Sequence, residues 1–120
     1  MSPHSAKILE FLNVLIPLCG WELRYSPSGF PYAALPQGFG DNEQGVKIHF
    51  IPNGGSIKVV GVIEHSDKIG VRRPHVYVSI YGDVDEATDF IKKRLLPRYK
   101  EAWYRAQPKI AKWLEEHPQP

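Results

Sequence analysis

The alternation of apolar and polar residues between positions 46 and 81 constrains the fold of this chain more than any other feature. The first six of these residues alternate with period two, the pattern of a strand with one buried face. Pro52–Gly55 then contains Asn-Gly, the dipeptide that most readily takes the positive φ of a hairpin turn. A β-branched run over 56–64 and a second alternating run over 75–81 follow. The pattern predicts three consecutive antiparallel strands.

The lengths of the two connections set the expected register of these strands. If Pro52–Gly55 is a four-residue loop, Ile48 lies opposite Val59. If residues 65–74 form the second connection, Val59 lies opposite Ile80. One face of the sheet then forms the core, with Gly61 as a gap among Val46, Ile48, Phe50, Ile57, Val59, Ile63, Val76, Val78 and Ile80.

The segments on either side of the three strands predict covering helices. Ser2-Pro3 is a helix start, and the apolar residues that follow leave only a narrow polar stripe before Gly20. Asp83 caps a second helix, which has acids in its first turns and bases at its end, as the helix dipole favours. Pro97 kinks or ends that helix, and Pro108 begins a last helical segment.

The stretch between the first helix and the three strands is less regular. Residues 21–25 alternate and predict a fourth strand, and a short extra strand is expected near Tyr32–Leu35 in one interpretation. The rest of 26–45, rich in proline and glycine, either packs over a sheet edge or serves as a binding loop. The sequence therefore predicts one α+β domain over 1–120. This domain has two layers, an antiparallel sheet of four to five strands with N-terminal and C-terminal helices, in the order α-β-β-β-β-α-α.

Length and cysteine content bound the class of protein. A chain of 120 residues can bury a core without metals or disulfides. The single cysteine, Cys19, excludes an internal disulfide and favours a reducing compartment. The apolar run 8–19 is interrupted by Glu10 and Asn13, has no cleavage site after it and is too short to span a bilayer. We therefore expect a cytoplasmic protein that does not associate with membranes.

No spacing of reactive residues predicts a cofactor or a metal. The five histidines and Cys19 lack the close spacings of zinc sites, and no glycine-rich loop leads from a strand into a helix. No serine or cysteine lies in a nucleophile signature, so we assign no catalytic residue. The expected register nevertheless makes His49, Lys58 and Tyr81 neighbours on the polar sheet face. This row supports an alternative function, a small metal-independent ribonuclease.

Positive charge is concentrated near the C-terminus, although the formal net charge is only +2. Residues 92–113 hold eight of the fifteen lysines and arginines against one acid, Glu101. The second connection adds three more cations, and the open sheet face adds two tyrosines. The predicted binding surface comprises Lys68, Arg72, Arg73, Lys93, Arg94, Arg98, Lys100, Arg105, Tyr77 and Tyr81.

Two kinds of partner fit such a surface. Cations bind phosphates while interleaved aromatic rings stack on bases, which favours nucleic acid; the rings concerned are Tyr99, Trp103, Tyr104 and Trp113. Cations equally bind an acidic protein surface, in which case the chain is an inhibitor or adaptor of a larger machine. The alternative is that the charges solvate a helix and that Tyr99 and Trp103 are core anchors. We expect a non-enzymatic binding protein, and an exposed sheet edge also allows a homodimer.

Overall fold

The computed structural model describes residues 3–118, with side chains from residue 5 onward. These residues form one five-stranded antiparallel sheet in the order β1-β2-β3-β4-β5, together with helices at both ends of the chain. The predicted α+β class and single domain are confirmed, and the extra strand expected near Tyr32 is present as β2. The elements are α1 Pro3–Leu18, β1 Glu22–Tyr25, β2 Pro31–Ala34, β3 Lys47–Asn53, β4 Ser56–Gly61, α2 Ser66–Ile69, β5 His75–Ser79, α3 Val84–Arg94 and α4 Leu96–Glu116.

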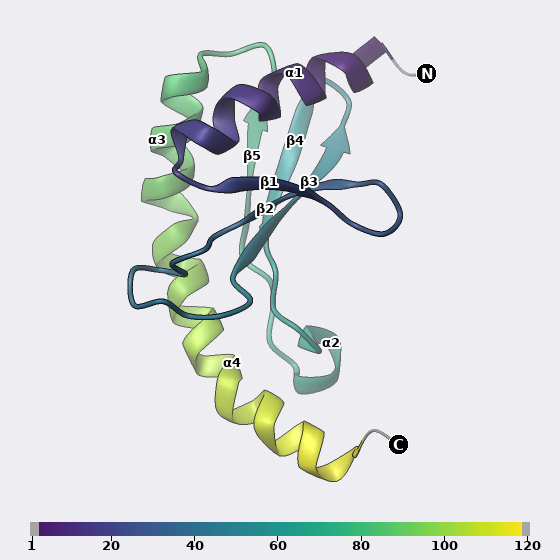
Figure 1. Ribbon diagram of the computed structural model, residues 1–120, viewed down its shortest axis with the longest axis vertical. Helices are drawn as coiled ribbons and strands as arrows, with labels where there is room; N and C mark the ends of the chain where they lie inside the picture. The colour runs from purple at the N-terminus through teal and green to yellow at the C-terminus, as the bar shows by residue number, and fades with distance from the viewer. Residues whose placement is uncertain (1–2, 119–120) are drawn as a thin grey trace.

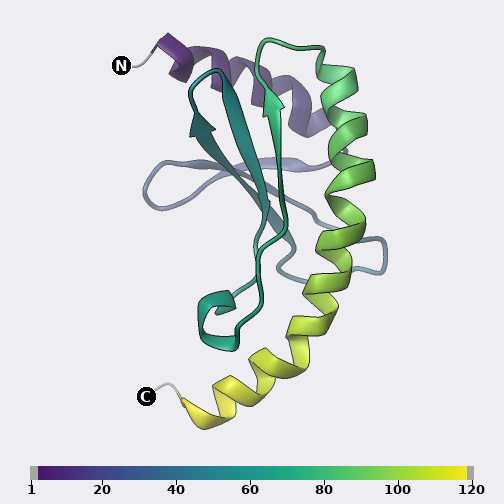
Figure 2. The same cartoon turned by 180° about the vertical axis from the view of Figure 1, so that it is seen from behind.

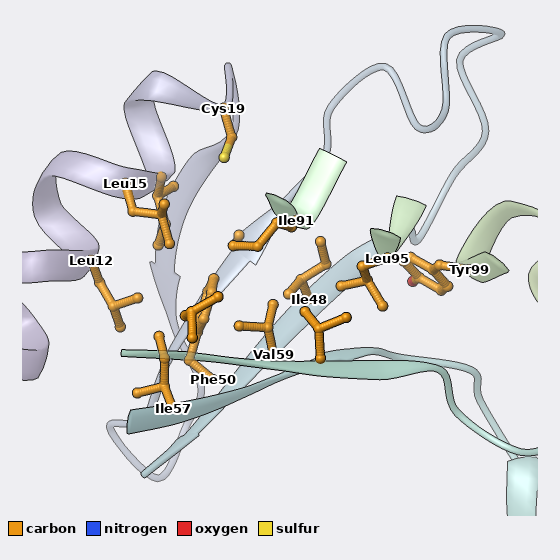
Figure 3. Packing of buried hydrophobic residues seen from close by; sticks show 14 of the residues in the cluster. Leu12, Leu15, Cys19, Ile48, Phe50, Ile57, Val59, Ile91, Leu95 and Tyr99 are labelled. Atoms are coloured by element: carbon orange, nitrogen blue, oxygen red, sulfur yellow. The ribbon is translucent and has the colours of Figure 1, made fainter. Parts of the chain in front are cut away.

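The twist of the sheet leaves β1 and β2 crossing the direction of β4 and β5 (Figure 1). α1 lies across one end of the strands, and α3 and α4 form a long arc beside β5 (Figure 2). The core fills the space between the sheet, α1, α3 and the first half of α4. Figure 3 shows side chains such as Leu15, Ile48 and Ile91 meeting there.

The alternation in the sequence predicted the faces of β3, β4 and β5 correctly. All nine apolar residues expected on the core face are buried. Tyr77, which was expected on the open sheet face, is exposed, and Ser79, two residues further on, is exposed as well. Val60 also belongs to that face, yet it is buried, because it is paired with His49 of β3 on one side and with His75 of β5 on the other.

β3 and β4 are joined by a two-residue turn, which corrects the expected four-residue loop. Gly54 has a φ of 63°, and strand pairing reaches Asn53 opposite Ser56. Pro52 is therefore part of β3. It is tolerated because it lies past the end of β2, where one side of β3 has no partner strand and no ladder hydrogen bond is lost.

Both expected registers were wrong by an even number of residues. Val59 lies opposite Phe50 and Val76, instead of Ile48 and Ile80. The connection between β4 and β5 is longer than expected and contains α2. Because side chains alternate with period two, an even shift keeps each residue on its face and changes only its cross-strand neighbours.

Two predicted helix ends are confirmed. α1 stops at Leu18, shortly before Gly20, which has a φ of 80°. The expected cap at its other end, Ser2, lies outside the described residues. At the start of α3, the Asp83 carboxylate accepts hydrogen bonds from the backbone amides two and three residues further on, at 2.7 and 3.2 Å.

The two prolines of the C-terminal region have different effects. α3 ends at Arg94, and Pro97 lies in the first turn of α4, where a missing amide hydrogen costs little. The predicted break at Pro97 is confirmed. Pro108 instead lies inside α4, so the prediction that it begins a separate segment was wrong. The helix absorbs this proline by curving, as Figure 2 shows.

Tyr99 fastens α4 to the sheet and confirms the prediction of a core anchor. Its side chain is fully buried and lies directly over Gly61, where any Cβ would overlap the ring. Its hydroxyl lies 2.8 Å from the carbonyl oxygens of Lys47 and Val62 and accepts the Lys47 amide at 3.2 Å. Burial raises the pKa of Tyr99 to about 12, although these hydrogen bonds act in the opposite direction. One side chain thus bonds to the start of β3 and to the residue that follows β4.

The second half of the irregular stretch packs against α4, not over a sheet edge. The Phe39 ring lies 5.0 Å from the Tyr99 ring and 5.8 Å from the Trp103 ring, measured between centroids. The Glu43 carboxylate accepts hydrogen bonds from the Phe39 amide at 2.6 Å and from the Tyr104 hydroxyl at 2.7 Å. The Tyr104 bond is the main reason why the pKa of Glu43 is lowered. These contacts hold the loop to the helix.

The far end of α4 extends past the strands and is supported by the short helix α2 (Figure 1). The Trp113 ring is stacked between His65, at a centroid distance of 4.5 Å, and His117, at 4.4 Å. His65 precedes α2 and has a φ of 58°, which is uncommon for a residue other than glycine.

Candidate functional site

A groove with cationic walls lies between α4 and the segment that leads from α2 into β5. Residues 70–75 form one wall and one side of α4 forms the other, around a volume of about 580 Å³. One carboxylate, that of Glu101, lies among its cations. We call this site the basic groove and define it by its five cationic residues, Arg72, Arg73, Arg98, Arg105 and Lys109.

Helical spacing places three of these cations together. Arg98, Arg105 and Lys109 are seven and four residues apart, so they lie on one side of α4. The adjoining side of the helix is buried in the core and consists of Tyr99, Ala102 and Ala106. Lys109 was not among the predicted binding residues. Its spacing from Arg105 was the available signal, but the expected helix break at Pro108 concealed it.

Two arginines of the groove are oriented by backbone carbonyl groups. The Arg98 guanidinium donates to the carbonyl oxygens of Arg94, at 2.9 Å, and His75, at 3.0 Å. The second of these bonds connects α4 to β5. The Arg73 guanidinium donates twice to the carbonyl oxygen of Ile63, at 3.2 and 3.3 Å. These bonds to neutral acceptors position both guanidinium groups and leave their positive charge uncompensated.

The remaining cations of the groove are available to a ligand. Within residues 5–118, the side chains of Arg72 and Lys109 have no hydrogen-bond or ion-pair partner. Arg105 pairs with Glu101 at 2.8 Å, and both side chains are exposed. An exposed pair of this kind contributes roughly 0–1 kcal/mol, so a stronger anion can displace the Glu101 carboxylate.

Two further hollows continue from the basic groove along β5. The first has a volume of about 600 Å³, shares Arg98 with the groove and is lined by Lys93 and Arg94. The second has a volume of about 380 Å³, shares Phe90 with the first and is lined by Tyr77. Seven of the ten predicted binding residues therefore line one continuous strip of surface.

The other three predicted binding residues lie elsewhere. Lys68 is exposed on α2, and Lys100 is exposed on a different side of α4 from the groove. Tyr81 follows β5, and its ring lies against Gly55 and 6.0 Å from the Lys7 ammonium nitrogen. None of the three lines the basic groove.

The four rings of α4 that were expected to stack on bases make contacts within the protein, although Tyr104 is 42% exposed. Tyr99 is buried, and Trp103 contacts Phe39. Tyr104 bonds to Glu43, and Trp113 is stacked between two histidines. His75 is the single aromatic residue among those that line the basic groove. The groove therefore offers charge without a stacking platform.

In the observed register, the three residues that suggested a ribonuclease, His49, Lys58 and Tyr81, are no longer neighbours. His49 lies opposite Val60, whereas Lys58 lies between Ile51 and Tyr77. Tyr81 lies outside β5, so the three side chains do not form a row. The pKa of His49 is lowered, first by burial and then by the charges of Lys47 and Arg73. The predicted neighbourhood was wrong because it rested on the loop lengths.

Within the described residues, no three His, Cys, Asp or Glu side chains gather as ligands for a metal ion. No helix formed by residues 3–118 is both long enough and apolar enough to cross a bilayer. The chain matches no protein-family model, no curated protein and no solved structure.

Proposed function

We propose that this chain is a small non-enzymatic binding protein whose basic groove holds an acidic segment of a partner protein. The convergence of five cationic side chains from two parts of the chain around one open groove supports the proposal most directly. Such a protein acts as an inhibitor or adaptor of a larger machine, a role that requires no catalytic residue. The cytoplasmic location expected from Cys19 is part of the same proposal.

The surroundings of the groove favour carboxylates over nucleic-acid phosphates as its ligands. Proteins that bind single strands combine cations with exposed rings on which bases stack, and no Phe, Tyr or Trp ring of residues 5–118 lines the basic groove. Arginine forks bind carboxylates through paired hydrogen bonds, and four of the five cations are arginines.

A titration with labelled probes at two salt concentrations tests this function. The probes are an aspartate- and glutamate-rich peptide, single-stranded RNA, single-stranded DNA and duplex DNA. We expect the peptide to bind most tightly, with an affinity that falls as salt rises because the interaction is electrostatic. The triple variant Arg98→Glu, Arg105→Glu, Lys109→Glu should weaken peptide binding by orders of magnitude.

A matched control separates the groove from net charge. The variant Lys68→Glu, Lys100→Glu, Lys112→Glu changes the net charge equally at exposed positions that do not line the groove. It should bind the peptide nearly as the unmodified protein does. If any nucleic acid bound more tightly than the peptide, the ligand of the groove would be nucleic acid and not an acidic peptide. Equal losses in the two triple variants would refute a specific groove.

A further inference from the structure

β5 is an edge of the sheet, and alternate residues along it direct their peptide groups away from the sheet. The Gly61 amide donates to the Pro74 carbonyl at 2.9 Å, and the Ile80 amide donates to the Gly55 carbonyl at 3.2 Å. Bonding to a neighbouring antiparallel strand alternates along a strand, so the peptide groups that point outward are those of His75, Tyr77 and Ser79. Arg98 bonds to the outward carbonyl of His75, in agreement with this alternation.

The outward peptide groups at the centre of this edge have no partner in residues 3–118, whereas the His75 carbonyl already accepts from Arg98. Within the described residues, no hydrogen bond reaches the backbone amide or carbonyl of Tyr77. The Tyr77 side chain is 51% exposed, and Phe90 of the neighbouring helix α3 is 42% exposed. A free strand edge flanked by exposed aromatic rings is a surface on which another strand can pair.

α3 runs beside this edge (Figure 2). The two ends of this helix carry opposite charges. Acids occupy its first turn, and Lys92, Lys93 and Arg94 occupy its last. Glu86 and Arg94 each lie four residues from Phe90, so both are on the same side of the helix as that ring. Within residues 3–118, neither Glu86 nor Arg94 has an ion-pair partner.

We propose that this surface, formed by β5 and α3, binds a second copy of the same chain. A two-fold axis beside Tyr77 pairs the two β5 strands antiparallel, so that His75 of one copy lies opposite Ser79 of the other. The same axis sets the two α3 helices antiparallel with Phe90 near the centre. Glu86 of each copy then faces Arg94 of the other, since both are four residues from the centre in opposite directions.

Charge complementarity identifies a second copy as the occupant. Each copy brings both signs to the interface, and the antiparallel arrangement places acid against base twice. An acidic peptide or a nucleic acid on the same edge would meet Asp83 and Glu86 at one end. The basic groove meets this surface at His75, whereas Arg105 and Lys109 line the groove alone. The inference therefore does not depend on the proposed function.

Measurement of molar mass over a wide range of protein concentration, by light scattering and sedimentation, tests the dimer. The unmodified chain should pass from monomer to dimer. Glu86→Lys or Arg94→Glu alone should abolish the dimer over that range, because each places like charges opposite one another. The double variant carrying both changes swaps the signs within each copy and should restore the dimer.

Circular dichroism confirms that each variant is folded, and Glu10→Lys, at an exposed position on α1, serves as the control that should leave the dimer intact. A monomer at every concentration overturns the inference. A dimer that persists in both single variants also overturns it, because that dimer uses another surface. The groove variant Arg105→Glu should dimerise normally, so failure of anion binding and failure of dimerisation are separate results.

Discussion

The two sides of α4 differ in what their residues touch. On one side Tyr99, Ala102 and Ala106 are buried in the core. On the other side Arg105 and Lys109 are exposed and line an open groove. Tyr99 fills the space that Gly61 leaves in the sheet.

This difference separates the requirements of folding from those of binding within one helix. The buried side must match a fixed shape and bond to specific backbone groups, so most replacements there lower stability. The groove side must supply charge at a given place, and exposed charges contribute little to stability. Substitutions on the two sides should therefore have different consequences, and three measurements can establish or break that division.

Tyr99→Ala should produce the largest change. Loss of a fully buried aromatic ring should lower the free energy of unfolding by about 3–5 kcal/mol, measured by urea unfolding. Tyr99→Phe keeps the ring but leaves the Lys47 amide without its acceptor, which should cost about 1–3 kcal/mol. If the Tyr99→Ala variant were as stable as the unmodified protein, this side chain would not fasten α4 to the sheet.

Alkaline pH should produce the next largest change. The folded chain holds the Tyr99 proton more tightly, with a pKa of about 12 against about 10 when unfolded, so this contribution is complete below pH 10. It should be lost as pH rises from 10 to 12, by roughly 2–3 kcal/mol. The pKa of Tyr104 is also raised to about 12, chiefly by its bond to Glu43. The experiment therefore compares two variants. The loss of stability between pH 10 and 12 should persist in Tyr104→Phe and should be absent in Tyr99→Phe.

Charge reversal on the groove side should change stability least. Arg105→Glu and Lys109→Glu should each shift the free energy of unfolding by no more than about 0.5 kcal/mol. Both residues are exposed, and Arg105 has only an exposed pair with Glu101 to lose. A loss comparable to that of Tyr99→Phe in the same urea titration would show that the groove side also holds the fold together.

The sequence predicted which residues of the sheet are buried, but not which of them are neighbours. Val59 was correctly placed in the core, yet its partners are Phe50 and Val76. Face assignment depends only on alternation, whereas pairing depends on loop length and turn geometry. The sequence Pro-Asn-Gly-Gly allowed a two-residue or a four-residue connection, and the choice determined whether His49 and Lys58 were adjacent.

The candidate site was predictable to the extent that it is local. The charges on α4 could be read from the spacing of Arg98 and Arg105. Their approach to Arg72 and Arg73 could not, because it depends on the path of the chain through α2 and the length of the connection before β5. The position of the loop around Phe39 was equally inaccessible, since it depends on contacts with α4 that are distant in sequence.

The overhanging end of α4 has a consequence for motion within the folded chain. After Pro108 the helix is supported by α2 and the rings around Trp113, not by the sheet. Opening of these last turns breaks few buried contacts, so it requires less free energy than unfolding the domain. Backbone amides beyond Pro108 should therefore exchange with solvent deuterium well before those near Tyr99. The helix that looks continuous in the ribbon belongs to two regions of different local stability.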